Sequence, residues 1–354
     1  MKKSFLLSFV LMLSLAAALP GQETPVAPYP DNLERLQGDN GFSRGFGDTN
    51  HSFSFDWFDS HAHLAWSHYP NLLKGGQIQE VIDRWLGYTG VYHSGRLILL
   101  DPYLETMEWA KNDPRVYVFW WLVWEQANQL PEIKRRVEAG LIQGLKLHTG
   151  DFRRKENPDY HVMGSEAWHK VYRYCEEADL PVLIHVNEHW GDQAYTYGRG
   201  AKKFWARAGY TNQELLDYCL SELVAKHPKV KWILAHMNFQ GTETLSALFE
   251  RYPNLYVDTS IGMFLREYDH LTAAEIEPYR KFCIRWADRI MFGTDVFAYH
   301  PLESSYPGSL HNWWLPHYIF ISRLGLPQET LDKVTHGTCE AVLGKYLKKM
   351  PAEE

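Results

Sequence analysis

Histidine and aspartate residues follow short apolar segments of this chain at several places. The first is the run Asp59-Ser60-His61-Ala62-His63. Residues i and i+2 point to the same side of an extended segment, so both imidazoles can face one point. Two imidazoles held together suit a borderline cation such as Zn²⁺. The spacing therefore predicts that His61 and His63 bind a metal, with Asp59 behind them in a structural or supporting role.

Later segments carry similar groups at the same relative place. His148 ends one apolar run, His185 lies in the next, and His236 and Asp295 end two others. A third nitrogen from His185 and an oxygen from Asp295 would complete a ligand set that leaves room for water. One such histidine would mean little in a chain with 17. Their recurrence at successive segment ends predicts a common site.

The elements that would position these side chains are eight short apolar segments. Runs this apolar are typical of strands covered on both faces. In chain order they are 53–59, 96–101, 116–120, 144–148, 181–186, 231–236, 254–258 and 290–295. Helical patterns separate them, for example over 165–178, 212–226 and 242–251.

This alternation of strands and helices predicts a parallel sheet. Eight units favour a (β/α)₈ TIM barrel over an open sheet, and no G-x-G-x-x-G motif follows the first strand. We expect a single catalytic barrel over residues 51–350. Barrel enzymes carry their catalytic groups at the carboxyl ends of the strands, where the histidines fall. Lys146 and His148 share parity, so both should face inward, with Lys146 one layer deeper.

Two connections are longer than the barrel requires. Residues 188–210 include Trp190 and Arg199, and residues 297–314 include Tyr299. Both follow strands and should lie on the active-site face. These three side chains are therefore candidates for substrate binding. His148 and Lys146, which should face inward, could orient an anionic part of the substrate, and a structural role is the alternative for Lys146. Aromatic packing over the barrel mouth is an alternative explanation of the two loops.

The first 21 residues resemble a secretory signal. Lys2 and Lys3 precede an apolar run from Phe5 to Ala18, which ends in three small residues. The run is shorter than the ~20 residues of a membrane-spanning helix, so we expect cleavage rather than stable membrane insertion. The protein should be exported, to the periplasm in a Gram-negative bacterium. Residues 22–50 are expected to form an extended arm.

Charge and cysteine content narrow the function classes. Without Lys2 and Lys3 the chain has 34 basic and 43 acidic residues, a net charge near −9, which disfavours nucleic-acid binding. The four cysteines, at positions 175, 219, 283 and 339, form no C-x-x-C motif and predict no thiolate zinc site. Burial as small apolar side chains and disulfide pairing in an exported protein both stay open. A homo-oligomer is also left open.

These motifs together resemble the amidohydrolase superfamily, in its amidohydrolase-related (family 2) branch. The resemblance extends from Phe58–His63 to the closing run Thr335–Gly344. It includes Gly144-Leu145-Lys146-Leu147-His148, Pro181-Val182-Leu183-Ile184-His185, Ile233-Leu234-Ala235-His236 and Met291-Phe292-Gly293-Thr294-Asp295. The closing run departs from the usual pattern, since Thr338-Cys339 stands where Asn-Ala is usual. That position is expected to serve helix docking.

The resemblance implies that His61, His63, His185 and Asp295 bind one divalent metal, usually zinc. His236 would polarise the substrate or stabilise the transition state beside it. Asp295 would act as general base and then as general acid. Binuclear branches use a carboxylated lysine that ends the fourth strand. Lys146 precedes His148 and lies deep, so a mononuclear site is favoured.

Three functions remain. The first is an exported metal-dependent hydrolase that uses activated water to cleave a C–N or C–O bond in a small-molecule substrate, such as an amide or lactone. The second is a metal-dependent decarboxylase or hydratase of the same branch. The third is a non-catalytic binding barrel, which should lack a ligand, and no ligand is missing from the sequence.

Overall fold

A computed structural model describes residues 56–64, 76–88, 95–149, 159–186, 212–260, 272–297 and 315–350. Its strands form one parallel sheet in the order β8-β7-β6-β5-β4-β3-β2-β1-β9. They are β1 (Phe58–His63), β2 (Arg96–Asp101), β3 (Val116–Leu122), β4 (Gly144–His148), β5 (Val182–His185), β6 (Trp232–Leu234), β7 (Leu255–Asp258), β8 (Ile290–Met291) and β9 (Val296–Phe297).

The sheet closes on itself through the two short strands at its ends. β8 and β9 are successive parts of one segment, and β9 pairs with β1 while β8 pairs with β7. Between them, the Ser60 amide donates to the Phe292 carbonyl at 2.9 Å. The first strand is thus bonded along the eighth strand segment, and the predicted (β/α)₈ barrel is confirmed.

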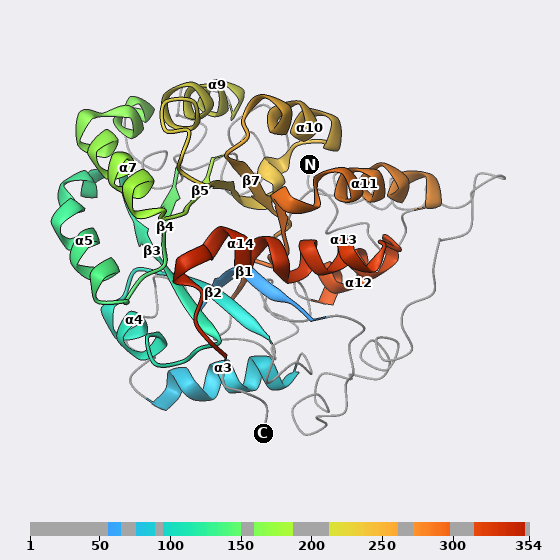
Figure 1. Cartoon of the computed structure of the whole chain (residues 1–354), viewed down its shortest axis with the longest axis horizontal. Helices are drawn as coiled ribbons and strands as arrows, with labels where there is room; N and C mark the ends of the chain where they lie inside the picture. Colours follow the sequence, from blue (N-terminus) through green and yellow to red (C-terminus); the bar gives the residue numbers. More distant parts are fainter. Residues whose placement is uncertain are drawn as a thin grey trace, which may run out of the picture.

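Helices surround this barrel, and the last of them lies across one of its ends (Figure 1). They are α3 (Gly76–Tyr88), α4 (Leu104–Ala110), α5 (Leu130–Glu138), α7 (Glu166–Ala178), α9 (Asn212–Tyr218), α10 (Thr242–Arg251), α11 (Ala273–Trp286), α12 (Leu315–Arg323), α13 (Gln328–Asp332) and α14 (Thr338–Leu343). Shorter turns include η2 (Trp124–Gln129), η3 (Tyr160–Gly164), η5 (Cys219–Val224), η6 (Ala235–Phe239), η7 (Ala287–Arg289), η9 (Lys333–Gly337) and η10 (Gly344–Tyr346).

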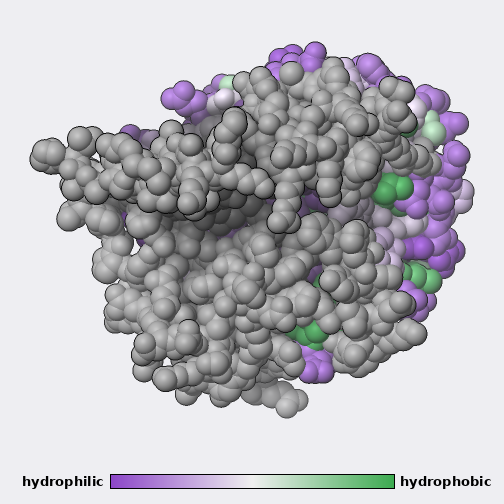
Figure 2. All heavy atoms as spheres, turned by 180° about the vertical axis from the view of Figure 1, so that it is seen from behind, coloured by the Kyte–Doolittle hydropathy of each residue, from purple (hydrophilic) through white to green (hydrophobic). Residues whose placement is uncertain are grey.

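The outer surface of the helices is mainly polar. In Figure 2 the coloured residues are mostly hydrophilic, with isolated hydrophobic spots. Among the described residues, Ile284 is the only large hydrophobic side chain that is exposed to solvent. Within the same ranges, every helix is too short or too polar to span a lipid bilayer.

The strands are buried on both faces, with alternate residues in two apolar clusters. Leu97 and Leu99 of β2 belong to the outer cluster beneath the helices, whereas Ile98 and Leu100 belong to the inner one. The inner cluster also contains Val342 from α14 and Phe58 from the start of β1. α14 therefore closes the amino end of the barrel and leaves the carboxyl end for the site.

Several boundaries differ from those expected from the sequence. The first strand was expected to end at Asp59, but β1 includes His61 and His63. The sixth strand ends at Leu234, and the eighth is interrupted after Met291. The helix expected over 212–226 is α9 followed by the π-helical turn η5. In each case a bond across the barrel or a local backbone deviation overrides the apolar pattern.

The four cysteines are buried and free, so the disulfide alternative is not realised in the structure. The expected signal sequence and extended arm, residues 1–50, lie outside the described residues.

Candidate metal centre and active site

A β-bulge in β1 decides which way its two histidines face. Asp59 pairs with Leu97, but Ala62 pairs with Leu99, so β1 carries one extra residue between them. Phe58 belongs to the inner cluster and Ala62 to the outer one, which an unbroken period of two would not allow. The extra residue reverses the alternation. His61 and His63 are therefore both turned to the barrel interior.

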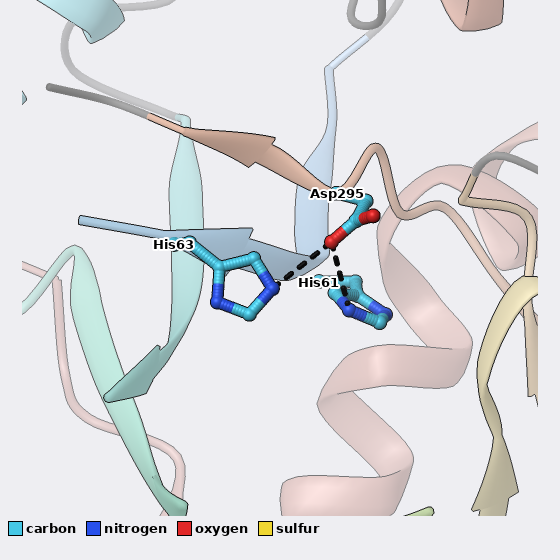
Figure 3. Close-up of side chains that lie close together, drawn as sticks. All are labelled: His61, His63 and Asp295. Carbon is cyan, nitrogen blue, oxygen red and sulfur yellow. Dashed lines mark ion pairs between the residues drawn. The ribbon is translucent and has the colours of Figure 1, made fainter. Parts of the chain in front are cut away.

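Asp295 lies on the segment between β8 and β9, beside β1, and its carboxylate points toward both histidines (Figure 3). Its Oδ1 atom lies 3.2 Å from His61 Nε2 and 2.9 Å from His63 Nε2. Asp295 has a left-handed φ of 59°, and its amide donates to the His61 carbonyl at 2.6 Å. Asp59 supports this turn, because its carboxylate accepts from the amide and hydroxyl of Thr294 and from the amide of His61.

The second ring nitrogen of each histidine has an acceptor. His61 Nδ1 lies 2.8 Å from Asp258 Oδ2, and His63 Nδ1 lies 3.2 Å from the Leu100 carbonyl. An ionised carboxylate and a carbonyl can only accept, so both Nδ1 atoms carry hydrogen. In the neutral rings the Nε2 atoms then hold the lone pairs, and these face Asp295. Supporting acceptors of this kind orient histidine ligands in metalloproteins.

His236 and His185 follow the same rule next to this group. His236 Nδ1 lies 2.9 Å from the Ser260 carbonyl and therefore carries its hydrogen. Its Nε2 atom accepts from His185 Nδ1 at 3.1 Å. The Nε2 atom of neutral His185 consequently holds a lone pair as well. Four imidazoles of the site thus share one tautomer.

The charges at the site are uneven. Burial alone would raise the pKa of Asp258. The nearby His61 ring, its hydrogen bond to the carboxylate, and smaller contributions from His236 and Ser260 outweigh burial and hold this pKa at about 2. The pKa of Asp295 is well below its usual value for the same reason. Burial lowers the pKa of His236 to about 3, so this ring is neutral. Burial and Lys146 act to lower the pKa of His61, yet Asp258 and Asp295 raise it overall.

These observations fit a divalent cation. The pKa of His61 is raised because two buried carboxylates favour a positive charge between them. The ligand atoms of His61, His63 and Asp295 lie within 4.8 Å of one another, so this group could hold a metal ion. His185 is outside that group, and its neighbour is His236. Three of the four predicted ligands thus lie together. The fourth, His185, is separated from them by the ring of His236.

Lys146 and His148 lie where their parity predicted. Leu145 and Leu147 pack in the outer cluster, so the alternate side chains of β4 face the interior. Lys146 is almost fully buried, and its charge acts to lower the pKa of His61, His63, His185 and His236. The His148 ring lies 4.1 Å from that of His185. The predicted substrate contacts Trp190, Arg199 and Tyr299 lie outside the described residues.

Sequence reasoning missed three residues of the site. Asp258 ends β7 and Ser260 follows it, and both bond to His61 and His236. Trp121 of β3 is stacked on His148 with ring centroids 5.6 Å apart and lies 5.5 Å from His63. Asp258 could have been found, because it is a carboxylate at a strand end like Asp295. Trp121 carries no such signal in an apolar run.

Comparisons with known proteins agree with this fold. A protein described as an uncharacterized TIM-barrel protein from Bordetella bronchiseptica is 15% identical, with a TM-score of 0.51, over 82% of this chain and 99% of that chain. A candidate amidohydrolase from Staphylococcus aureus is 15% identical, with a TM-score of 0.52, over 82% of this chain and all of that chain. Identities this low show a shared fold alone. No curated protein matches the chain.

A family model described as Amidohydrolase matches residues 104–345. The match covers His185, His236 and Asp295 and begins after the His61–His63 pair. It spans more than half of the chain, and the barrel and its histidine pattern agree with it. Members of this family typically bind a metal. The chain belongs to the amidohydrolase superfamily, in its amidohydrolase-related (family 2) branch.

Proposed function

We propose that this protein is a metal-dependent hydrolase that cleaves a C–N or C–O bond in a small molecule. One observation carries the proposal: two imidazole Nε2 atoms converge on one oxygen of Asp295, and both Nδ1 atoms are held by acceptors. Imidazole and carboxylate donors suit Zn²⁺, which we propose as the metal. His185, next to this group, is proposed as the fourth ligand.

When bound, the metal would supply Lewis-acid polarisation of a carbonyl and would make water more acidic. The side chains do the remaining work. His61 and His63 would hold the cation, while Asp295 is ionised and could accept a proton from water. The Asp295 side chain is 14% exposed, whereas those of Asp258 and His61 are fully buried or nearly so, so Asp295 is the carboxylate that a substrate can reach. The proton would then pass to the leaving group.

His236 has a less direct position than the sequence suggested. Both of its ring nitrogens are engaged, Nδ1 by Ser260 and Nε2 by His185. With its hydrogen on Nδ1, the Nε2 atom can only accept, so His236 can polarise a substrate only if the contact with His185 opens and Nε2 takes up a proton. We therefore propose His236 as a second catalytic group that substrate and metal bring into use.

Metal content tests the site. Purified protein should contain about one zinc or similar ion per chain, and chelation should abolish turnover until Zn²⁺ is restored. The double variant His61→Asn, His63→Asn should lose the metal, because the two converging nitrogens are removed. A double variant that kept the full metal content would contradict the proposed site.

Substrate panels separate the reaction classes. We expect turnover of amides or lactones, measured as release of an acid, and loss of that turnover in Asp295→Asn. Release of CO₂ from carboxylated aromatic compounds, without any hydrolysis, would make the protein a decarboxylase instead. A protein that bound metal and ligands but turned nothing over would be a binding barrel.

We also propose that residues 1–21 direct export. The positive start and the apolar run Phe5–Ala18 support this. When the full chain is expressed in a Gram-negative host, a shortened protein should be recovered from the periplasm. Mass spectrometry should place its N-terminus between Leu19 and Gln22. A variant without residues 5–18 is the control and should stay in the cytoplasm. Recovery of the full-length chain with Met1 intact in the cytoplasm would contradict export.

A further inference from the structure

We propose that Asp258 is a positioning residue that sets the tautomer of His61 and tethers the turn that carries His236. The inference deepens the proposed function, since it concerns the metal site described there. Asp258 is the last residue of β7 and is fully buried. Its carboxylate bonds to His61, to the His236 amide and to Ser260, so it acts on the site through His61 and His236.

The two carboxylate oxygens of Asp258 serve two different groups. Oδ2 accepts from His61 Nδ1 at 2.8 Å. Oδ1 accepts from the His236 amide at 2.9 Å, from the Ser260 amide at 3.1 Å and from the Ser260 hydroxyl. One oxygen therefore faces an imidazole and the other faces two backbone donors. Only a group that accepts on both sides satisfies all of these partners.

The same geometry could be read as a second cation site. Ligand atoms of His61, His236 and Asp258 lie within 4.8 Å of one another. The hydrogen bonds argue against a metal there. His236 Nδ1 carries a hydrogen toward the Ser260 carbonyl, and the carboxylate already has donors on both oxygens. Hydrogen bonds to His61, His236 and Ser260 therefore account for both carboxylate oxygens of Asp258 without a metal.

Asp258 also anchors an unusual backbone segment. Residues 236–239 all have positive φ, between 48° and 61°. Left-handed residues rarely follow one another without glycine, so neighbouring bonds must hold them. The bond from the His236 amide to Asp258 Oδ1 fixes the first residue of this turn. A single carboxylate thus links a proposed metal ligand to a proposed catalytic histidine.

Replacement of Asp258 by asparagine gives a sharp test. The amide oxygen of Asn should stay toward the two backbone amides, because reversal would place an NH₂ group against two donors. The NH₂ group then faces His61 Nδ1 and forces hydrogen onto Nε2, which points at the metal site. Alanine would impose no tautomer, since water can replace the lost acceptor. Asn should therefore impair the site more than Ala, although Asn has the better shape.

The measurement is the dissociation constant for Zn²⁺ alone, by competition with a chelator, on the full-length mature protein. We expect Asp258→Asn to weaken binding about 10- to 100-fold, and Asp258→Ala to weaken it less. The Co²⁺-loaded proteins should show the same order of change in their visible spectra. The matched control is Asp101→Asn: Asp101 is the buried last residue of β2 and accepts from the Tyr103 amide, and this variant should bind Zn²⁺ like wild type.

A thermodynamic cycle separates positioning from general damage. In a His61→Asn background, Asp258→Asn should change Zn²⁺ affinity less than about threefold, because its route to the metal through the His61 tautomer is gone and His236 is not a proposed ligand. An equal loss in both backgrounds, or a larger loss for Ala than for Asn, would overturn the inference while the metal site stood. If the wild type bound no metal, the proposed function would fail and the inference with it. Thermal unfolding of each metal-free variant checks that it folds. If the alanine variant does not fold, the comparison of Asp258→Asn in the two backgrounds tests the inference without it.

Discussion

Two buried aspartates at equivalent strand ends show how neighbours decide the state of a residue. Asp258 faces the imidazole of His61, which holds its pKa at about 2 in spite of burial. Burial raises the pKa of Asp101 to about 7, because the backbone donor of Tyr103 and the hydroxyl donor of Thr106 offset only part of the effect of burial. The first is a permanent anion and can orient an imidazole. The second is partly protonated at neutral pH and serves the start of α4.

The state of Asp101 predicts a pH dependence of stability. Its pKa in the folded protein is above the ordinary value of 3.8, so the folded state binds more protons between about pH 4 and pH 7. The contribution of Asp101 to stability should therefore fall as the pH rises through this window. Asp101→Asn can accept the same bonds without a charge. Its Tm relative to wild type should rise from pH 4.5 to pH 8, and an unchanged difference would contradict the assignment.

At the scale of elements, the site depends on a close approach between β1, β7 and the segment after β8. A Cβ atom at Gly293 would lie 3.0 Å from Ser60 Oγ, 3.1 Å from Asp258 Cβ and 3.2 Å from His61 Cβ. All three residues are buried, two of the atoms are Cβ atoms that no rotation of the side chain can move, and the Ser60 hydroxyl donates to the Phe292 carbonyl. Glycine at 293 lets all three elements meet.

Gly293→Ala should accordingly disturb both the fold and the metal site. We expect a loss of about 1–3 kcal/mol in the free energy of unfolding from overpacking. We also expect weaker Zn²⁺ binding, because the displaced neighbours are His61 and Asp258. Gly337→Ala is the control: its Cβ would lie 3.4 Å from the Asp332 carbonyl, in a helical turn, and stability should stay constant or rise. Urea unfolding and chelator competition measure the two effects. Full stability together with full affinity in Gly293→Ala would contradict the close approach.

At the scale of the whole molecule, the candidate site lies at one end of the barrel and the segments that close the barrel lie at the other. The histidines lie at the carboxyl ends of the strands, while α14 and the segment after it cover the amino end. Lys348 binds there: its amide donates to the Tyr117 hydroxyl, and its Nζ atom donates to the carbonyls of Ala110, Asp113 and Val116. Burial lowers the pKa of Lys348 to about 8. The C-terminal segment is thereby tied to α4 and β3.

Lys348→Met should loosen this closure without touching the site. Three carbonyls lose a donor, and we expect a loss of about 1–3 kcal/mol in the free energy of unfolding. Zn²⁺ affinity should not change, because the metal site lies at the other end of the barrel. Lys349→Met, at an exposed neighbouring position, is the control and should leave the Tm unchanged. A drop in Zn²⁺ affinity for Lys348→Met would show that the two ends are coupled.

The amino-acid sequence by itself determined the strands and the place of the histidines on them. β2, β4 and α10 begin and end where their apolar patterns predicted. The bounds of these elements follow from local periodicity, since the pattern itself tells which side chains are buried. The inward direction of His148 and Lys146 followed from the same period of two. The family followed from the order of short motifs along the chain.

The tertiary structure decided how those side chains meet. The bulge in β1 turns His61 and His63 inward, and the register with β2 that creates it cannot be read from β1 alone. The interruption between β8 and β9 depends on bonds from Asp295 and Thr294 to β1. Asp258 became part of the site because parallel strands distant in sequence end at one edge of the barrel. Local patterns fix which face a residue can take, whereas hydrogen-bond partners across the barrel fix its neighbours, its tautomer and its charge.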